Sequence, residues 1–228
     1  MAPRLKLFIS IVLLSATTIA AAAEPKLELA VPFTDNMILQ RQAMVPVWGF
    51  DAPNAQVTVA FAGQKKTATA DQHGNWMLKL DPLVASHEGR DFKITNNRNE
   101  SIVLQNVLVG EVWFSSGQSN MVWLANKSMC NELAREIARS EKDIPIREIN
   151  INTVSALYPQ KKGTSDGGWK THKNAGSFSA LSLSFAHALH KELNIPVGIL
   201  LSAHSNTRIE AFTQRQAIEK HPLLKQDA

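Results

Sequence analysis

The sequence predicts a β-sandwich followed by an α/β domain that carries part of a doubly wound parallel sheet. Residues 24–105 contain short alternating runs separated by turn-forming residues, without a helical period, which is typical of an antiparallel sandwich. After residue 105, buried runs of β-branched residues alternate with a helical pattern, which is the order of a parallel sheet. We therefore divide the chain into a leader (1–23), a β-sandwich domain (24–105) and an α/β domain (106–228).

The composition is that of a globular protein. Of the 228 residues, 44% are hydrophobic and 19% are charged. Removing Arg4 and Lys6 with the leader lowers the formal net charge from +4 to +2, which is too small to indicate a nucleic-acid or acidic membrane partner. No group of His, Asp or Glu has the spacing of metal ligands, so we expect no metal and no cofactor.

The first 23 residues have the pattern of a secretory signal peptide. Arg4 and Lys6 form a basic n-region, Leu7–Leu14 is apolar, and Ala21–Ala23 is a small-residue cleavage site before Glu24. The alternative is an uncleaved membrane anchor, but the apolar run is short for a spanning helix. We expect cleavage and a secreted or periplasmic protein. Cys130 is the only cysteine, so we expect no intramolecular disulfide and interpret it as a half-buried helix residue rather than a catalytic thiol.

The predicted sandwich consists of short strands joined by turns. Asp71–Asn75 is interpreted as a hairpin-like turn, and 96–100 as another. Trp48 and Trp76 lie in alternating runs, which favours core positions over stacking on a sugar. The strands are expected within residues 26–31, 37–39, 44–48, 57–61, 66–70, 76–80, 92–95 and 101–104.

Val107–Trp113 is the first expected strand of the α/β domain, and we expect it to be buried on both faces. Small polar residues follow it, from Ser115 to Asn120. A serine on a tight turn at the carboxyl end of a buried strand lies where open α/β sheets bind ligands, and its N–H can stabilise an oxyanion. From the local pattern alone, an ordinary serine-rich loop between a strand and a helix remains an alternative.

The remaining elements follow in alternating order. Cys130–Ser140 indicates a short amphipathic helix, Ile146–Ile151 a strand, and Tyr158–Asn174 a long surface loop. A helix is expected from Phe178, with Ser177 as its N-cap and Leu181, Phe185 and Leu189 in its apolar face, while His187 and His190 face water. The strand Val197–Leu201 and the charged helical stretch Gln214–Lys220 complete the series.

Gly110–Trp113 followed by Ser116–Met121 resembles the signature of the sialate O-acetylesterase family, within the SGNH-type hydrolases. Asp35–Arg41 and Phe178–Ala180 are also similar to that family. The resemblance implies an SGNH or flavodoxin-like sheet and the hydrolysis of O-acetyl groups on sialic acid or a related sugar. It implies that Ser119 is the nucleophile, with Gln118 beside it in the oxyanion or substrate-binding group.

The segment Ser202–Phe212 follows the second buried strand, and in a parallel sheet it should rise beside the Ser119 turn. It resembles a family segment whose glycine amide helps to bind the oxyanion, but here Ser205 and Asn206 replace the glycine pair. Ser205 and Asn206 are candidate oxyanion donors, and Asn206 tolerates a left-handed backbone. Arg208 is a candidate for pairing with a substrate carboxylate, or a solvated loop cation. His204 replaces a tryptophan, so a plain substitution is favoured over a role as the base.

The family places its acid and base in an Asp-x-x-His arrangement, which this sequence lacks. None of the five histidines after Ser119 has an aspartate three residues before it. We therefore expect the acid–base pair to lie beyond Ala228, and the 228-residue chain alone to be nearly inactive. A second polypeptide that completes the catalytic domain is a candidate partner. The competing hypotheses are a non-catalytic secreted carbohydrate-binding remnant and an esterase for other acetylated sugars, such as xylan.

Overall fold

The computed structural model describes residues 25–127, 132–140, 143–154, 156, 158 and 160–222. The signal peptide, its cleavage site and Cys130 lie outside these residues. None of the described helices is both long and apolar enough to cross a membrane. The elements, in chain order, are β1 (Glu28–Leu29), β2 (Ile38–Gln40), β3 (Val45–Phe50), β4 (Gln56–Phe61), β5 (Gln64–Thr69), β6 (Asn75–Leu80), β7 (Ser86–Asn96), β8 (Ser101–Gly117), α1 (Ser119–Val122), α2 (Glu132–Arg139), β9 (Ile146–Asn150), η1 (His172–Ser177), α3 (Ala180–Leu193), β10 (Val197–Ala203), η2 (Ile209–Phe212) and α4 (Arg215–Lys220).

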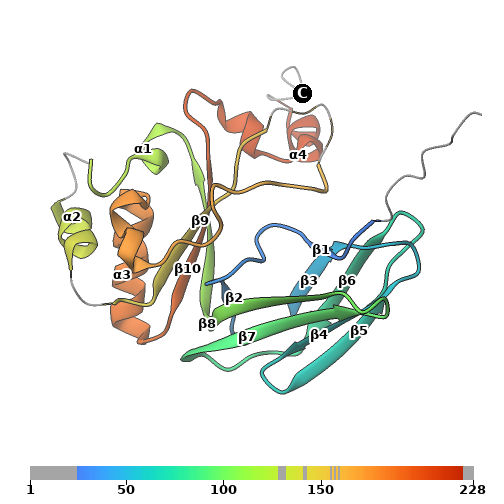
Figure 1. The fold of residues 1–228 in the computed structure, drawn as a ribbon. Coiled ribbons are helices and arrows are strands. Elements are labelled where there is room, and N and C mark those ends of the chain that lie inside the picture. The colour runs from blue at the N-terminus through green and yellow to red at the C-terminus, as the bar shows by residue number, and fades with distance from the viewer. Residues whose placement is uncertain are drawn as a thin grey trace, which may run out of the picture.

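The N-terminal strands divide between two sheets that share one hydrophobic core (Figure 1). One sheet has the order β1-β3-β6, and the other begins β5-β4-β7-β8. The predicted hairpin at Asp71–Asn75 is wrong, because β5 pairs with β4 and β6 pairs with β3, so this turn crosses between sheets. Trp76 is buried and Trp48 packs edge-on against Phe33, which confirms that both belong to the core. The β-sandwich itself stays a prediction, because β8 joins these strands to the parallel sheet.

β8 is the strand that connects the two parts of the molecule. It runs without interruption across residues 105 and 106, where the sequence placed a domain boundary. Its first half pairs antiparallel with β7, and residues 111–117 pair in parallel with β10, which in turn pairs in parallel with β9. The parallel strands and their helices confirm the α/β part of the prediction. The order β8-β10-β9 differs from a flavodoxin-like order, in which the first strand would separate the other two.

The two faces of the parallel sheet are covered differently. Apolar side chains of β9 and β10 on one face pack against α2, η1 and α3. The other face contributes Ile149, Leu200 and Val112 to the core of the N-terminal strands. Among the described residues, helices therefore cover one face only, and the doubly wound arrangement is not observed (Figure 1).

Helix α3 is present, but it is rotated relative to the expected orientation. It begins two residues later than predicted, with Ser179 rather than Ser177 as its N-cap. Its buried face contains Leu183 and Ala186, whereas Leu181 and Phe185 of the predicted apolar face are exposed. His187 and His190 are half-buried rather than fully exposed; burial lowers the pKa of His187, and the His190 ring bonds the Ile195 carbonyl oxygen. Helix periodicity gave the right element but not the face that meets the sheet.

The segment expected to be a surface loop, Tyr158–Asn174, instead partly covers the edge of β9. Lys170 forms an antiparallel bridge with Glu148, and Ser165 forms one with Ile151. Trp169 is buried, and its indole N–H donates to the Pro32 carbonyl oxygen at 2.7 Å. This indole therefore fastens the loop to the N-terminal strands.

Candidate active site at the carboxyl end of the parallel sheet

Ser119 lies directly after the carboxyl end of β8, as the first residue of the one-turn helix α1. The predicted end of the strand was too early, because residues 115–117 continue β8 instead of forming the turn. The chain reverses at Gly117, whose φ of +141° favours glycine. A Cβ there would also lie 3.0 Å from the Met121 side chain. Ser119 is exposed to solvent.

The loop after β10 lies beside the Ser119 turn, as expected from the parallel pairing of the two strands. Ser202 and Ala203 are in register with Ser116 and Gly117, so both strands end at the same height. The Gly117 carbonyl oxygen accepts the His204 N–H at 2.9 Å. The Gln118 side-chain amide donates to the Thr207 carbonyl oxygen. Gln118 therefore fixes one loop to the other, which the sequence did not indicate.

The two loops present backbone N–H groups that no acceptor of the described chain occupies. These belong to Ser119, Ser205 and Asn206, of which the last has a left-handed φ of +58°. Ser205 and Asn206 form an exposed turn. Unpaired N–H groups on exposed turns can bind a developing oxyanion without first breaking a hydrogen bond. Arg208 is exposed and forms no ion pair with a described carboxylate, so the structure leaves both of its interpretations open.

No histidine activates Ser119 in this structure. Among the described residues, which include every histidine of the chain, none is hydrogen-bonded to the Ser119 hydroxyl. His204 lies in the adjoining loop, where its backbone bonds Gly117 and its side chain is exposed. The described residues also contain no group of three His, Cys, Asp or Glu side chains that could hold a metal ion.

The N-terminal end of α3 supports the Ser119 segment from the other side. The Ala180 N–H donates to the Trp123 carbonyl oxygen at 2.8 Å, and the Ala125 N–H donates to the Phe178 carbonyl oxygen at 2.9 Å. The Ser115 and Ser182 hydroxyls are 2.7 Å apart, which ties the end of β8 to the same helix. The Ser119 turn is thus held between the β10 loop and α3.

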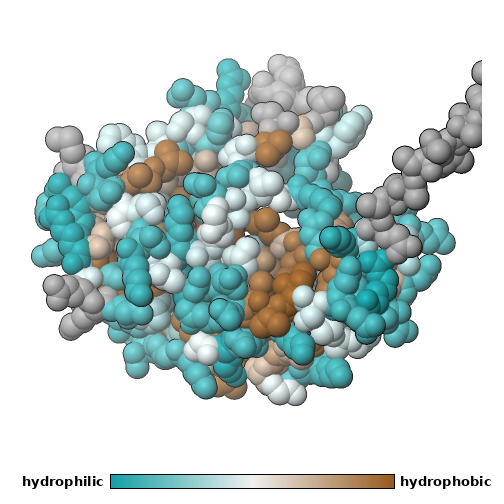
Figure 2. Space-filling model, viewed as in Figure 1, coloured by the Kyte–Doolittle hydropathy of each residue, from teal (hydrophilic) through white to brown (hydrophobic). Residues whose placement is uncertain are grey.

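One edge of β8 is unpaired near the candidate site. β2 pairs with residues 108–110 and ends at Gln40, whose side-chain oxygen accepts the Val112 N–H at 2.8 Å. Beyond that point no described strand continues this edge. The expectation that Val107–Trp113 is buried on both faces is wrong at its end, since Trp113 is 45% and the following Phe114 67% exposed. Figure 2 shows apolar side chains at the surface over α1, where Val122 and Trp123 are exposed.

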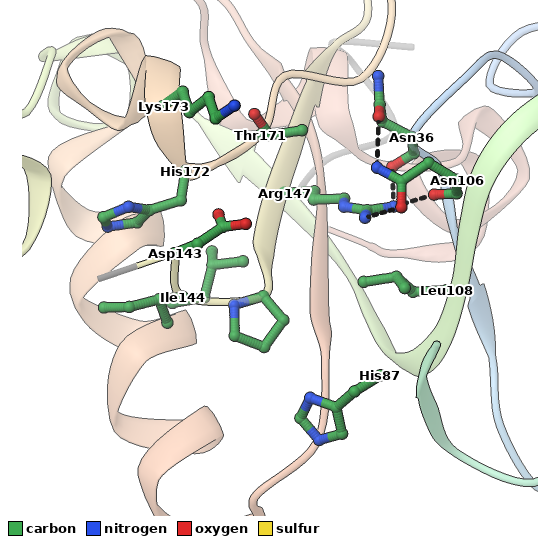
Figure 3. A pocket seen from close by; sticks show the side chains of 12 residues that line it. Asn36, His87, Asn106, Leu108, Asp143, Ile144, Arg147, Thr171, His172 and Lys173 are labelled. Atoms are coloured by element: carbon green, nitrogen blue, oxygen red, sulfur yellow. Dashed lines mark hydrogen bonds between the residues drawn. The ribbon is translucent and has the colours of Figure 1, made fainter. Parts of the chain in front are cut away.

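A cavity lies at the opposite end of the parallel strands. It has a volume of about 490 Å³, and Ile146, the first residue of β9, lines it together with Asp143, His172 and Lys173. Figure 3 shows the Arg147 guanidinium turned away from Asp143 and toward Asn36 and Asn106. Ligands of open α/β sheets bind at the carboxyl ends of the strands, so this cavity is not the candidate active site.

Two buried charged residues of β9 were not predicted. Arg147 donates to the carbonyl oxygens of Asn36, Met37 and Asn106, at 2.6–3.2 Å, and burial lowers its pKa to about 10. Glu148 accepts the Ser179 N–H with both carboxylate oxygens, and burial raises its pKa to about 7. Their partners lie 31 to 111 residues away, so alternation in β9 alone could not reveal them.

Comparisons with known proteins agree on one group of enzymes. The chain is 30% identical over 212 residues to the sialate O-acetylesterase of Homo sapiens, covering 84% of this chain and 40% of the human protein. The sialate O-acetylesterase of Mus musculus is 27% identical over 214 residues, covering 82% and 38%. The crystal structure of a carbohydrate acetylesterase from Xanthomonas citri superposes with a TM-score of 0.77 at 29% identity, covering 86% of this chain and 44% of that one. No protein-family model matches. The chain thus spans about two fifths of the length of these relatives.

Proposed function

We propose that this chain, which is similar to the sialate O-acetylesterases over the part that it shares with them, carries the nucleophile of a carbohydrate O-acetylesterase. The observation that carries the proposal is the arrangement at Ser119. Its hydroxyl is exposed at the carboxyl end of β8, between a loop with unpaired N–H groups and the start of α3. The proposed substrate is an acetyl ester of a sugar hydroxyl.

In the proposed reaction, Ser119 Oγ attacks the acetyl carbonyl carbon and loses its proton to a base. The carbonyl oxygen becomes an oxyanion, which the N–H groups of Ser119 and of the turn at Ser205 and Asn206 stabilise. Collapse of this intermediate expels the sugar oxygen, which takes up the proton from the base. Water then loses a proton to the base and attacks the carbonyl carbon of the acetyl-serine. Collapse of the second intermediate releases acetate, and the serine oxygen takes the proton back from the base. Losing one oxyanion donor costs on the order of 3 kcal/mol in such reactions.

We assign the base to a histidine outside this chain, on the second part of the catalytic domain. Three observations support this assignment: no histidine bonds Ser119 Oγ, the chain spans about two fifths of its relatives, and no strand of the described residues pairs with the edge of β8 beside the site. The second part would pair with that edge, cover Trp113 and Phe114, and bring the acid–base pair to Ser119. The alternative base is His204, and the acetate-release experiment described below also tests this alternative.

A non-catalytic, secreted carbohydrate-binding role is the second candidate function, because a serine without a base is a poor nucleophile. The substrate class within the proposed function depends on Arg208. If Arg208 pairs with a substrate carboxylate, O-acetylated sialic acid should be preferred over acetylated xylan, which has no carboxylate on its acetylated xylose units. Replacing Arg208 by Met should then weaken the preference through KM.

The test measures acetate release from both substrates, by the chain alone and by the chain co-expressed with the C-terminal remainder of the Xanthomonas citri relative. We expect almost no activity from the chain alone and Ser119-dependent activity from the pair. Ser119→Ala should lose orders of magnitude in kcat, while Ser101→Ala, at the far end of the same strand, should change little. Activity of Ser119→Ala above about a tenth of the unmodified pair would disprove the nucleophile assignment. Activity of the chain alone that His204→Ala abolishes would make His204 the base.

A further inference from the structure

Glu148 is a buried carboxylate whose partner is a backbone N–H group rather than a cation. Its side chain lies in the middle strand position of β9 and is 3% exposed. Its two oxygens accept the Ser179 N–H at 3.2 and 3.1 Å, and no described Lys or Arg forms an ion pair with it. Burying a carboxylate is strongly unfavourable unless hydrogen bonds compensate. The fold therefore retains an expensive group at this position.

Ser179 is the residue through which Glu148 reaches the candidate active site. It is the N-cap of α3, and its side chain accepts the Ser182 N–H at 3.3 Å. It also forms an antiparallel bridge with Leu124, flanked by the bonds from Ala180 to Trp123 and from Ala125 to Phe178. Trp123 directly follows the helix that Ser119 begins. The path from the carboxylate to the Ser119 helix thus runs through the hydrogen bond to Ser179, the backbone on either side of Ser179, and the hydrogen bonds of Phe178 and Ala180 to residues 123–125.

We propose that Glu148 is a positioning residue that holds the segment carrying Ser119 against the start of α3, by fixing the backbone of Ser179. This inference rests on the proposed function, because it matters to catalysis only if Ser119 is the nucleophile. Glu148 itself touches neither substrate nor the Ser119 hydroxyl. The bonds on the β10 side, from His204 and Gln118, fix Gly117 and Gln118 but leave residues 123–125 to α3.

The ionisation of Glu148 makes this support dependent on pH. Burial raises the pKa of Glu148 to about 7, while the Ser179 N–H and the charge of Lys170 oppose the rise. On α3 the nearest titratable residue, His187, lies two turns from Ser179, and β10 has none. The titratable groups on the other neighbouring elements are Arg147 on β9, His172 and Lys173 on η1, Glu132, Arg135, Glu136 and Arg139 on α2, and Lys127 and Asp166 in the adjoining loops.

The direction of the effect follows from proton linkage. The closed segment binds the Glu148 proton more tightly than an opened segment, in which the carboxyl is hydrated and has its ordinary pKa of 4.5. Raising the pH therefore favours opening. Between pH 5 and pH 8 the opening equilibrium should rise by up to on the order of 50-fold, and it should level off above pH 7.

The test is hydrogen–deuterium exchange of the full chain, read in peptides covering residues 119–127 and 178–183 and corrected for the intrinsic exchange rate at each pH. The unmodified chain should lose protection in both peptides between pH 5 and pH 8, with α2 as an internal reference. Glu148→Gln, which cannot ionise, should abolish this pH dependence. Glu148→Ala should lower protection at every pH, because the Ser179 N–H loses its acceptor. Glu192→Gln, an exposed change on α3, should behave like the unmodified chain.

Two outcomes overturn the proposal. One is an equal pH dependence in the unmodified chain and in Glu148→Gln, and the other is unchanged protection of residues 123–127 in a folded Glu148→Ala. If Glu148→Ala does not fold, the comparison with Glu148→Gln still decides. The measurement needs no catalysis, so an inactive Ser119 would leave its result unaffected and would refute only the proposed function.

Discussion

Replacing Arg147 by methionine should destabilise the protein by about 3 kcal/mol, because this side chain joins the parallel sheet to the N-terminal strands. Arg147 comes from β9, is 6% exposed, and donates to the carbonyl oxygens of Asn36, Met37 and Asn106 and to the Asn106 side chain. In the variant, the Met37 oxygen would keep a second donor, the Leu108 N–H. The other acceptors, the carbonyl oxygen of Asn36 and both oxygens of Asn106, would lose the guanidinium donor. Asn106 has a left-handed φ of +56° at the irregularity where β8 shifts its register against β7.

The magnitude is a balance of two opposing terms. Hydrogen bonds from a charged donor contribute about 1.5–3 kcal/mol each. Three of the four share Nη1 as their donor, so together they are worth about 6 kcal/mol rather than a simple sum. Removing the buried guanidinium recovers about 3 kcal/mol of unfavourable desolvation, since burial lowers its pKa to about 10. The remainder is a net loss of about 3 kcal/mol. Arg147→Lys keeps the charge but has fewer hydrogen-bond donors, so its free energy of unfolding should lie between those of the unmodified chain and Arg147→Met.

The assay is urea unfolding of the full chain at low micromolar concentration, followed by far-UV circular dichroism. Arg139→Met is the matched control, because Arg139 is exposed on α2 and its loss should change stability by less than about 0.5 kcal/mol. The reasoning fails if Arg147→Met is as stable as this control. In that case the desolvation free energy recovered would equal the free energy of the lost hydrogen bonds. Arg147 would then not stabilise the contact between the parallel sheet and the N-terminal strands.

Three further predictions follow from other parts of the chain. The free energy of unfolding should decrease by at most about 3 kcal/mol as the pH rises from 4.5 to about 7, because the folded protein binds the Glu148 proton more tightly than the unfolded chain does. In Glu148→Gln, denaturation curves measured over the same pH range should show a smaller decrease. Gly110→Ala should strongly reduce the yield of folded protein, because its Cβ would lie 1.9 Å from the Pro196 carbonyl oxygen, whereas Gly163→Ala should be tolerated, its nearest neighbour being at 4.0 Å. Secreted protein should begin at Glu24, so an intact mass that retains residues 1–23 would contradict the predicted cleavage.

The order of elements and the meeting of the two loops could be predicted because both depend on local patterns. Buried runs of β-branched residues end in polar turns, and the carboxyl ends of parallel strands meet at one edge of a sheet. The left-handed Asn206 was within reach for the same reason, since asparagine adopts that conformation more readily than most residues. The Ser119 turn and the 202–208 loop are therefore adjacent as the sequence indicated.

The errors arise where a distant partner decides the structure. Residues 115–117 are small and polar, but pairing with β10 keeps them in the strand. Phe185 was assigned to the buried face of α3, yet it packs edge-on against Trp113, itself exposed, because the sheet meets the smaller residues Leu183 and Ala186. Ile146–Ile151 was predicted only as a strand, and its charged residues Arg147 and Glu148 are both buried by segments far away in the chain.

These same distant contacts explain why the candidate site is hydrogen-bonded to its neighbours on two sides and open on the third. The Ser119 turn is bonded to the β10 loop through Gly117 and Gln118, and to α3 through residues 123–125. Beyond Gln40, the remaining edge of β8 has no paired strand among the described residues, and Trp113 and Phe114 stand exposed beside it. An unpaired edge with exposed aromatic residues favours association with another strand. If the proposed second part supplies both that strand and the histidine, then covering the apolar surface and activating Ser119 are one event. Hydrolysis would then appear only when the sheet is completed, and the two should be lost together when that pairing is prevented.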